Sequence, residues 1–134
     1  MVMFSFERLA VWQKAIEYAD FVYKMTKDFP ADERFGLTSQ LRRSAVSVSA
    51  NVAEGSSRSS RADMARFIEI AYGSLLESVT SFEIAKRQQF LSPARYGEAY
   101  RQAETLAKML SGFRRTLKGK KNPNHVDPTL NPEP

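Results

Sequence analysis

Four segments in which apolar residues recur every three to four positions restrict the fold more than any other feature of the sequence. These segments span residues 5–28, 36–54, 61–90 and 93–117. Their spacing matches the 3.6-residue period of an α-helix, whereas strands would require strict alternation. Because the connections between them are short, consecutive helices should run antiparallel. The sequence therefore predicts an all-α domain, an antiparallel up-down-up-down four-helix bundle over residues 1–119.

The starts of the last two predicted helices carry local capping signals. Ser60 lies three residues before Asp63, an acidic variant of the capping box, and it should begin the third helix. Ser92 is followed by Pro93, and proline is favoured in the first turn of a helix, where its missing N–H costs nothing. We therefore expect both of these helices to begin at the residue that follows the serine.

Proline and glycine mark the ends of the helices. Pro30 disfavours helical geometry in the residue before it, so the first helix should stop by residue 28. Gly55 can adopt the left-handed conformation that closes a helix, and Gly119 can do the same for the fourth helix. The segment 120–134 is rich in proline and poor in apolar residues. We predict that it is a disordered C-terminal tail.

The composition excludes several classes of protein. The chain has no cysteine, which removes disulfides and thiolate metal sites and is typical of a reducing compartment. No window approaches the roughly 20 apolar residues of a membrane span, and the N-terminus lacks the pattern of a secretion signal. We expect a cytoplasmic protein with no membrane partner.

Catalytic motifs are missing. The single histidine, His125, lies in the predicted tail, so the helices carry no histidine that could activate a serine or complete the Glu-x-x-His pairs of di-iron bundles. No glycine-rich phosphate loop is present. Arg58 and Arg61 flank a helix N-terminus and could hold an anion, although an ordinary solvated loop is the favoured interpretation. We predict no enzymatic activity, no cofactor and no metal.

A polar stripe runs along the second predicted helix, at spacings of four and three residues, and a shorter one faces it from the third helix. We interpret the two stripes as a buried structural seam between the helices. Within it Arg43 and Glu77 are expected partners, because a buried charge must be paired. An active site is the alternative, disfavoured because no nucleophile lies beside a base. The predicted seam consists of Gln40, Arg43, Ser47, Asn51, Glu54, Ser74 and Glu77.

The first two helices have more apolar surface than one bundle core requires. Val46, Ala50 and Ala53 form a second face on helix two, and the arc of helix one reaches Val11, Tyr18 and Val22. Exposed together, these faces would exceed the apolar patch that soluble monomers tolerate. We predict a homo-oligomer in which they are buried, closed into a ring if the contact is head-to-tail. A dimer, or a broad face used entirely within one bundle, remains open.

Positive charge is concentrated at the end of the fourth helix. The formal net charge is +5, and the basic residues outside this cluster equal the 15 acidic residues in number. Such a cluster can contact phosphate, although a solvated helix end is the simpler interpretation. The candidate nucleic-acid contacts are Arg114, Arg115, Lys118, Lys120 and Lys121.

The sequence carries a set of distinctive residues: Trp12, Phe29-Pro30, Gly36-Leu37, Gln40, Arg43, Ser47, Asn51 through Gly55, Ser74 and Glu77. In these residues the chain from Phe4 to Leu117 resembles the four-helix-bundle proteins encoded within intervening sequences of bacterial large-subunit (23S) ribosomal RNA genes. This resemblance implies a cytosolic bundle that assembles into a ring of five and has no assigned catalytic activity.

Two functions are compatible with these features. The first is a non-enzymatic oligomeric scaffold or interaction protein with RNA or a protein as its candidate partner. The alternative is an accessory nucleic-acid-binding subunit of a reverse-transcriptase system, because the family resembles the basic pentameric accessory variability determinant of diversity-generating retroelements. The neutral balance of charge outside the C-terminal cluster favours the first function.

Overall fold

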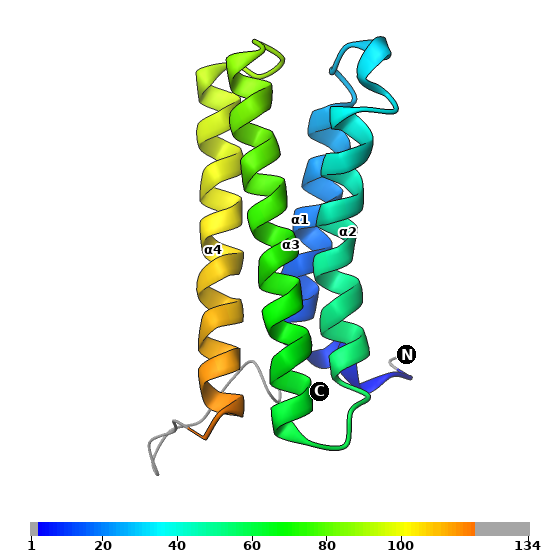
Figure 1. The fold of residues 1–134 in the computed structure, drawn as a ribbon, viewed down its shortest axis with the longest axis vertical. Helices are drawn as coiled ribbons and strands as arrows, with labels where there is room; N and C mark the ends of the chain where they lie inside the picture. Colours follow the sequence, from blue (N-terminus) through cyan, green and yellow to red (C-terminus); the bar gives the residue numbers. More distant parts are fainter. Residues whose placement is uncertain (1–2, 120–134) are drawn as a thin grey trace.

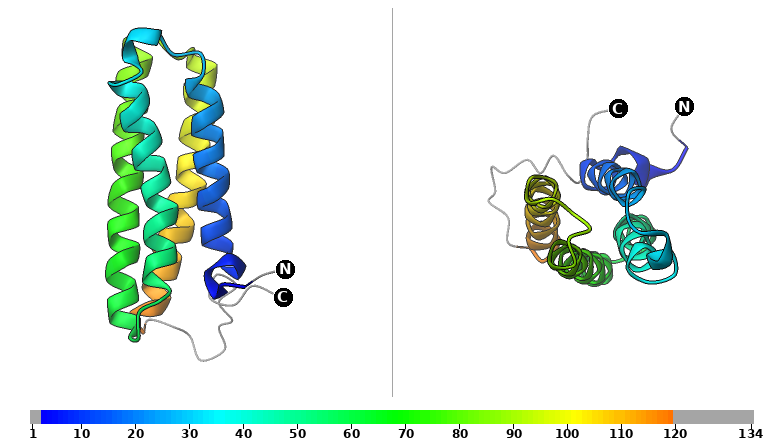
Figure 2. Two further views of the ribbon diagram at one scale, coloured as in Figure 1. Left: turned by 90° about the vertical axis from the view of Figure 1, so that its right-hand side faces the viewer. Right: turned by 90° about the horizontal axis from the view of Figure 1, so that it is seen from above.

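The protein is an antiparallel bundle of four α-helices within residues 3–119, the part of the chain that the computed structural model describes (Figure 1). The helices are α1 (Ala10–Thr26), α2 (Leu37–Gly55), α3 (Arg61–Arg87) and α4 (Pro93–Leu117). Each packs against the helix that follows it, and α1 also contacts α4, so the four enclose one core (Figure 2). The predicted fold class is confirmed. No helix in this part of the chain has the length and hydropathy required to cross a membrane.

The first helix is shorter than predicted at both ends. A 3-10 turn, η1 (Ser5–Arg8), precedes it, and Leu9 adopts an extended conformation between the two. This break lets Phe6 turn back and meet Trp12 edge-on, with ring centroids 5.1 Å apart. At the other end Phe29 packs against Phe90 across the bundle, at 5.7 Å. Both departures thus bring an aromatic ring into a tertiary contact that helical continuation would prevent.

The serine caps form as expected. The Ser60 hydroxyl accepts a hydrogen bond from the backbone N–H of Asp63 at 3.0 Å, and the Ser92 hydroxyl accepts one from Arg95 at 3.1 Å. The end of α3 differs from the prediction, because the helix stops at Arg87 rather than residue 90. Gln89 takes a left-handed φ of 66°, and Phe90 N–H then bonds to Ala85 O at 2.8 Å. Such a closure is usually made by glycine.

The second 3-10 turn, η2 (Ala31–Glu33), connects α1 to α2. The carboxylate of Glu33 accepts a hydrogen bond from the backbone N–H of Leu37 at 2.9 Å. It therefore satisfies one of the free donors at the start of α2 from outside the helix.

The core explains why α1 needs a wide apolar arc. This helix lies against both α2 and α4, so two sides of it are covered within one chain. Val11, Tyr18 and Val22 are each no more than 1% exposed. Our assignment of these three residues to an oligomer interface is therefore wrong, because the bundle itself buries them.

One polar pair crosses the core. The hydroxyl groups of Tyr18 and Ser78 lie 2.6 Å apart, and the Tyr18 ring meets Phe82 edge-on. Burial raises the pKa of Tyr18, an effect that the hydrogen bond to Ser78 partly opposes. Because Ser78 Oγ can also donate to the carbonyl of Leu75 at 2.7 Å, the buried hydroxyls are satisfied and α1 is joined to α3.

Gly55 has a different role from the one predicted. It belongs to α2 and is not left-handed, whereas Gly119 has a φ of 81°. A methyl group on Gly55 would lie 2.8 Å from Cβ of Phe67. Glycine is required here because α2 and α3 approach each other closely at this end of the pair.

We predict opposite effects of alanine at two helical glycines. Gly55→Ala should lower the free energy of unfolding by about 1–3 kcal/mol, because the new methyl group forces α2 and α3 apart. The matched control is Gly112→Ala in α4, where an added methyl meets nothing within 4 Å. It should stabilise the isolated chain by about 0.5–1 kcal/mol through helix propensity. Urea unfolding followed by circular dichroism measures both free energies of unfolding. If Gly55→Ala left the free energy of unfolding unchanged, this result would contradict the close approach of α2 and α3.

Candidate functional site

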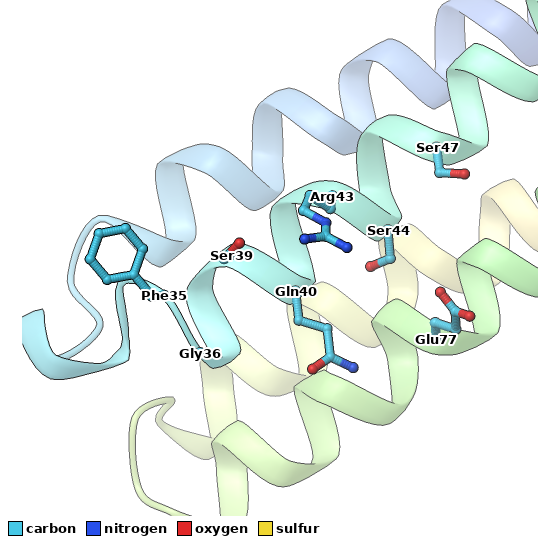
Figure 3. A pocket seen from close by; sticks show the side chains of 8 residues that line it. All are labelled: Phe35, Gly36, Ser39, Gln40, Arg43, Ser44, Ser47 and Glu77. Atoms are coloured by element: carbon cyan, nitrogen blue, oxygen red, sulfur yellow. The ribbon is translucent and has the colours of Figure 1, made fainter.

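A groove of about 670 Å³ lies between α2 and α3 at the end where α2 begins. Its walls carry mainly polar side chains from α2 and the carboxylate of Glu77 from α3. Figure 3 shows Gln40 extending from α2 toward α3, while Phe35 lies in the connection that precedes α2. The lining residues are Phe35, Gly36, Ser39, Gln40, Arg43, Ser44, Ser47 and Glu77.

The middle of the predicted polar seam forms a hydrogen-bonded cluster. The hydroxyls of Ser47 and Ser74 lie 2.9 Å apart and join α2 to α3. The side-chain amide of Asn51 donates to the carbonyl and to the hydroxyl of Ser47, at 2.9 and 3.0 Å. All three side chains are half-buried. Helical spacing therefore predicted correctly that these residues meet.

The charged members of the seam are exposed, so the seam is not buried as a whole. Arg43 and Glu77 both face solvent, and among the described residues no ion pair joins them. Gln40 is exposed as well. The expected Arg43–Glu77 pair is wrong because small serines between the helices leave a groove that water can enter. Solvated charges have no need of a partner.

Glu54, the last member of the predicted seam, is exposed and makes no contact with the Ser47–Asn51–Ser74 cluster among the hydrogen bonds of the described residues. Its carboxylate lies 3.4 Å from the guanidinium of Arg58, one turn further along. Arg58 also covers the ring of Phe67, with the guanidinium carbon 4.4 Å from the centroid. Arg61 donates a hydrogen bond of 2.8 Å to the carbonyl of Thr116 in α4. Both arginines thus make contacts within the chain, which supports the solvated-loop interpretation over an anion site.

Two of the serine hydroxyls that line the groove have carbonyl or hydroxyl partners. The Ser44 hydroxyl donates a hydrogen bond of 3.1 Å to the carbonyl of Leu41, and the Ser47 hydroxyl is hydrogen-bonded to that of Ser74. Catalysis by serine needs a base within hydrogen-bond reach of the hydroxyl. The arrangement suits binding through hydrogen bonds and charge rather than covalent chemistry.

The face predicted on the far side of the seam is at the surface. Val46 is 42% exposed, Ala50 is exposed and Ala53 is half-buried. Ile70, on α3, is 45% exposed. Ile70 lies one helical turn before Ser74, whose hydroxyl is hydrogen-bonded to Ser47 of α2. We define the α2/α3 face as Val46, Ala50 and Ala53 on α2 together with Ile70 on α3, apolar side chains of two adjacent helices that lie on either side of the Ser47–Ser74 contact.

The basic end of α4 has an acidic neighbour that is distant in sequence. The carboxylate of Glu69 lies 2.6 Å from Arg114 Nε and 3.5 Å from Lys118 Nζ. The hydrogen bond from Arg114, together with the charges of Arg114 and Lys118, lowers the pKa of Glu69. Arg115 stays exposed, and Lys120 and Lys121 fall outside the described residues. The positive charge is thus weaker than the sequence cluster suggests, although Arg61 adds to it from α3.

The fold and the groove define a class of protein: a helical bundle with a polar interhelical groove and no assembled catalytic centre among its described residues. Residues 7–112 match the family model described as 23S rRNA-intervening sequence protein. Since the match covers most of the chain, the protein belongs to the 23S rRNA-intervening sequence protein family, whose function is unknown.

A solved structure is similar over nearly its whole length. It is the crystal structure of a protein of unknown function from the S23 ribosomal protein family of Bacteroides thetaiotaomicron. The two share 24% sequence identity with a TM-score of 0.71, covering 79% of this chain and 99% of the other. At that identity the likeness establishes the fold alone. None of the curated proteins compared with this chain matches it.

We predict that Glu69 titrates at a lower pH than an ordinary glutamate. A lowered folded-state pKa means that the ion pair stabilises the fold at neutral pH and is lost as the pH falls through that pKa. NMR titration of the side-chain carboxyl measures the midpoint. Arg114→Ala should move it back toward the ordinary value, whereas Arg95→Ala, near the other end of the bundle, should leave it in place. An unchanged midpoint in Arg114→Ala would show that the pair does not form in solution.

Proposed function

We propose that the protein is a non-enzymatic scaffold that assembles with copies of itself through the α2/α3 face. The observation that carries this proposal is the exposure of Val46 and Ile70 on two adjacent helices, 42% and 45%. Gly73 lies one turn from Ile70 with open space above it, so another helix could approach α3 closely there. Burying such a face between subunits removes apolar surface from water without disturbing the core.

A head-to-tail contact between copies must close into a ring to avoid an open filament. The α2/α3 face is one side of such a contact, and a different surface of the neighbour is the other. The resemblance to the family supports a ring of five. It also supports a cytoplasmic location, and a role in presenting surfaces to RNA or to a protein partner.

Sedimentation equilibrium tests the assembly. We expect a mass near five times that of one 15.2 kDa chain. Val46→Glu should reduce it to that of a folded monomer, because a carboxylate would be buried without a partner in the interface. The matched control is Ile16→Glu on α1, a residue with the same 42% exposure as Val46. A wild-type mass near that of one chain would refute the oligomer.

A second candidate function is that of an accessory nucleic-acid-binding subunit. The observation in its favour is that Arg61 reaches from the start of α3 to the carbonyl of Thr116 in α4. This contact places a further positive charge beside the last turn of α4, which carries Arg114 and Arg115. Phosphate contacts supply affinity but read no sequence.

We predict weak, salt-sensitive binding of single-stranded RNA, because Glu69 already neutralises part of this charge. Fluorescence anisotropy measures the association constant across a series of salt concentrations. The logarithm of this constant should fall linearly with the logarithm of the salt concentration, with a slope of about −0.7 per phosphate contact. Alanine at both Arg115 and Lys118 should weaken binding and flatten this slope. The control variant has alanine at Arg87 and Arg95 instead. Tight binding at physiological salt, or equal losses in the two variants, would contradict this electrostatic account.

A further inference from the structure

A second groove runs along the outer surface between α3 and α4, the two helices that lie side by side in Figure 1. It consists of two hollows, of about 170 and 270 Å³, which share Glu104 and Ala107 in their walls. The groove is separate from the polar groove between α2 and α3 and from the α2/α3 face. We call it the α3/α4 groove.

The upper hollow of the α3/α4 groove is apolar. Leu76 and Tyr100 stand at its sides and are 51% and 49% exposed. Ala103 and Ala107, one helical turn apart on α4, form part of its wall. Large side chains beside small ones leave a depression into which the apolar side chain of another molecule fits.

The lower hollow is cationic. Lys108 and Arg115 line it together with Tyr72. Both basic side chains are exposed, and neither forms an ion pair with an acidic side chain that the structure describes. The α3/α4 groove thus passes from an apolar half to a half with two available positive charges.

We propose that the α3/α4 groove binds an amphipathic helix of a partner protein, with an apolar half and an acidic half. A ridge of side chains on one helix packs into the groove between two others, and recognition of this kind uses anchors spaced at i, i+3, i+4 and i+7. Tyr100 and Arg115 are about 22 Å apart along α4 at 1.5 Å per residue. A partner helix of about 15 residues therefore spans both hollows.

The direction of the partner helix follows from its charges. Acidic side chains stabilise the first turn of a helix, where the backbone N–H groups are free. The acidic half that meets Lys108 and Arg115 is thus favoured at the N-terminus of the partner. Because these residues lie toward the C-terminal end of α4, the bound helix runs antiparallel to α4.

The chemistry of the groove favours a protein over a nucleic acid. Glu104 lies where the two hollows meet. Its carboxylate would repel a phosphate backbone that follows the whole groove, whereas a partner helix can place a neutral side chain opposite it and keep its acidic side chains beside Lys108 and Arg115. The apolar half has no positive charge for a phosphate group. It can instead bury leucine side chains, and this burial contributes about 25 cal/mol of binding free energy per Å² of apolar surface. The proposal deepens the scaffold role proposed above, since it names the kind of partner, and it holds for a single chain as for a ring.

The test uses a fluorescein-labelled 18-residue peptide with glutamates in its first two turns and a leucine face in its last two. Its control has the same composition, with the leucines distributed around the helix. We expect the first peptide to bind the full-length protein at least tenfold more tightly than the second, by fluorescence anisotropy. Equal affinities would overturn the proposal.

Two pairs of variants locate the binding. Leu76→Asp should weaken it at least tenfold, while Ile16→Asp on α1 changes it less than twofold. A double Lys108→Glu, Arg115→Glu variant should also weaken it at least tenfold and reduce its dependence on salt, whereas Arg101→Glu should not. Circular dichroism melts establish that each variant is folded. Equal effects of the test and control variants would place the peptide elsewhere and overturn the proposal.

Competing occupants give different results. If Leu76→Asp changes the mass in sedimentation equilibrium, the groove is an interface between copies of this chain and the proposal is wrong. If RNA displaces the peptide and its own binding needs Lys108 and Arg115 but not Leu76, the groove serves nucleic acid instead. A wild-type monomer that still binds the peptide would refute the ring and leave this proposal intact.

Discussion

The close approach of α2 and α3 is the constraint on which the rest of the structure depends. Gly55 meets Phe67 with no room for a methyl group, and the hydroxyls of Ser47 and Ser74 are 2.9 Å apart further along the pair. Helices this close need small side chains where they touch. Toward the start of α2 the serines between the helices, Ser44 and Ser47, are too small to fill the space, so a polar groove opens there. One packing requirement therefore produces both the tight helix pair and the hollow beside it.

Local signals in the sequence were sufficient for most of the fold. The serine caps defined the starts of α3 and α4, because each cap is a hydrogen bond within four residues. The errors came from side-chain contacts that lie outside the helical pattern. Leu9 breaks the first helix so that Phe6 reaches Trp12, and the end of α3 at Gln89 accompanies the contact of Phe90 with Phe29. Helical periodicity carries no information about such contacts.

The candidate sites were predicted less completely, for a related reason. Periodicity places Ser47, Asn51 and Ser74 on facing stripes, and they do meet. It does not say how far apart two helices lie, so it could not show that Arg43 and Glu77 remain solvated. The charge at the end of α4 depends on Glu69 and Arg61, which precede their partners by 45 and 55 residues. Only the folded chain brings them together.

The outer surface of α3 borders both proposed interaction surfaces, and this arrangement has a consequence for a scaffold. Ile70 belongs to the α2/α3 face, whereas Leu76 stands at the edge of the α3/α4 groove, less than two helical turns away. A subunit seated on the first surface would hold α3 from one side and leave the second open. Inside the bundle the Tyr18–Ser78 pair joins α3 to α1, so the face of α3 that packs in the core is distinct from the two outer surfaces. A ring built through the α2/α3 face would therefore present one α3/α4 groove for each copy of the chain, provided that the second side of the subunit contact lies elsewhere.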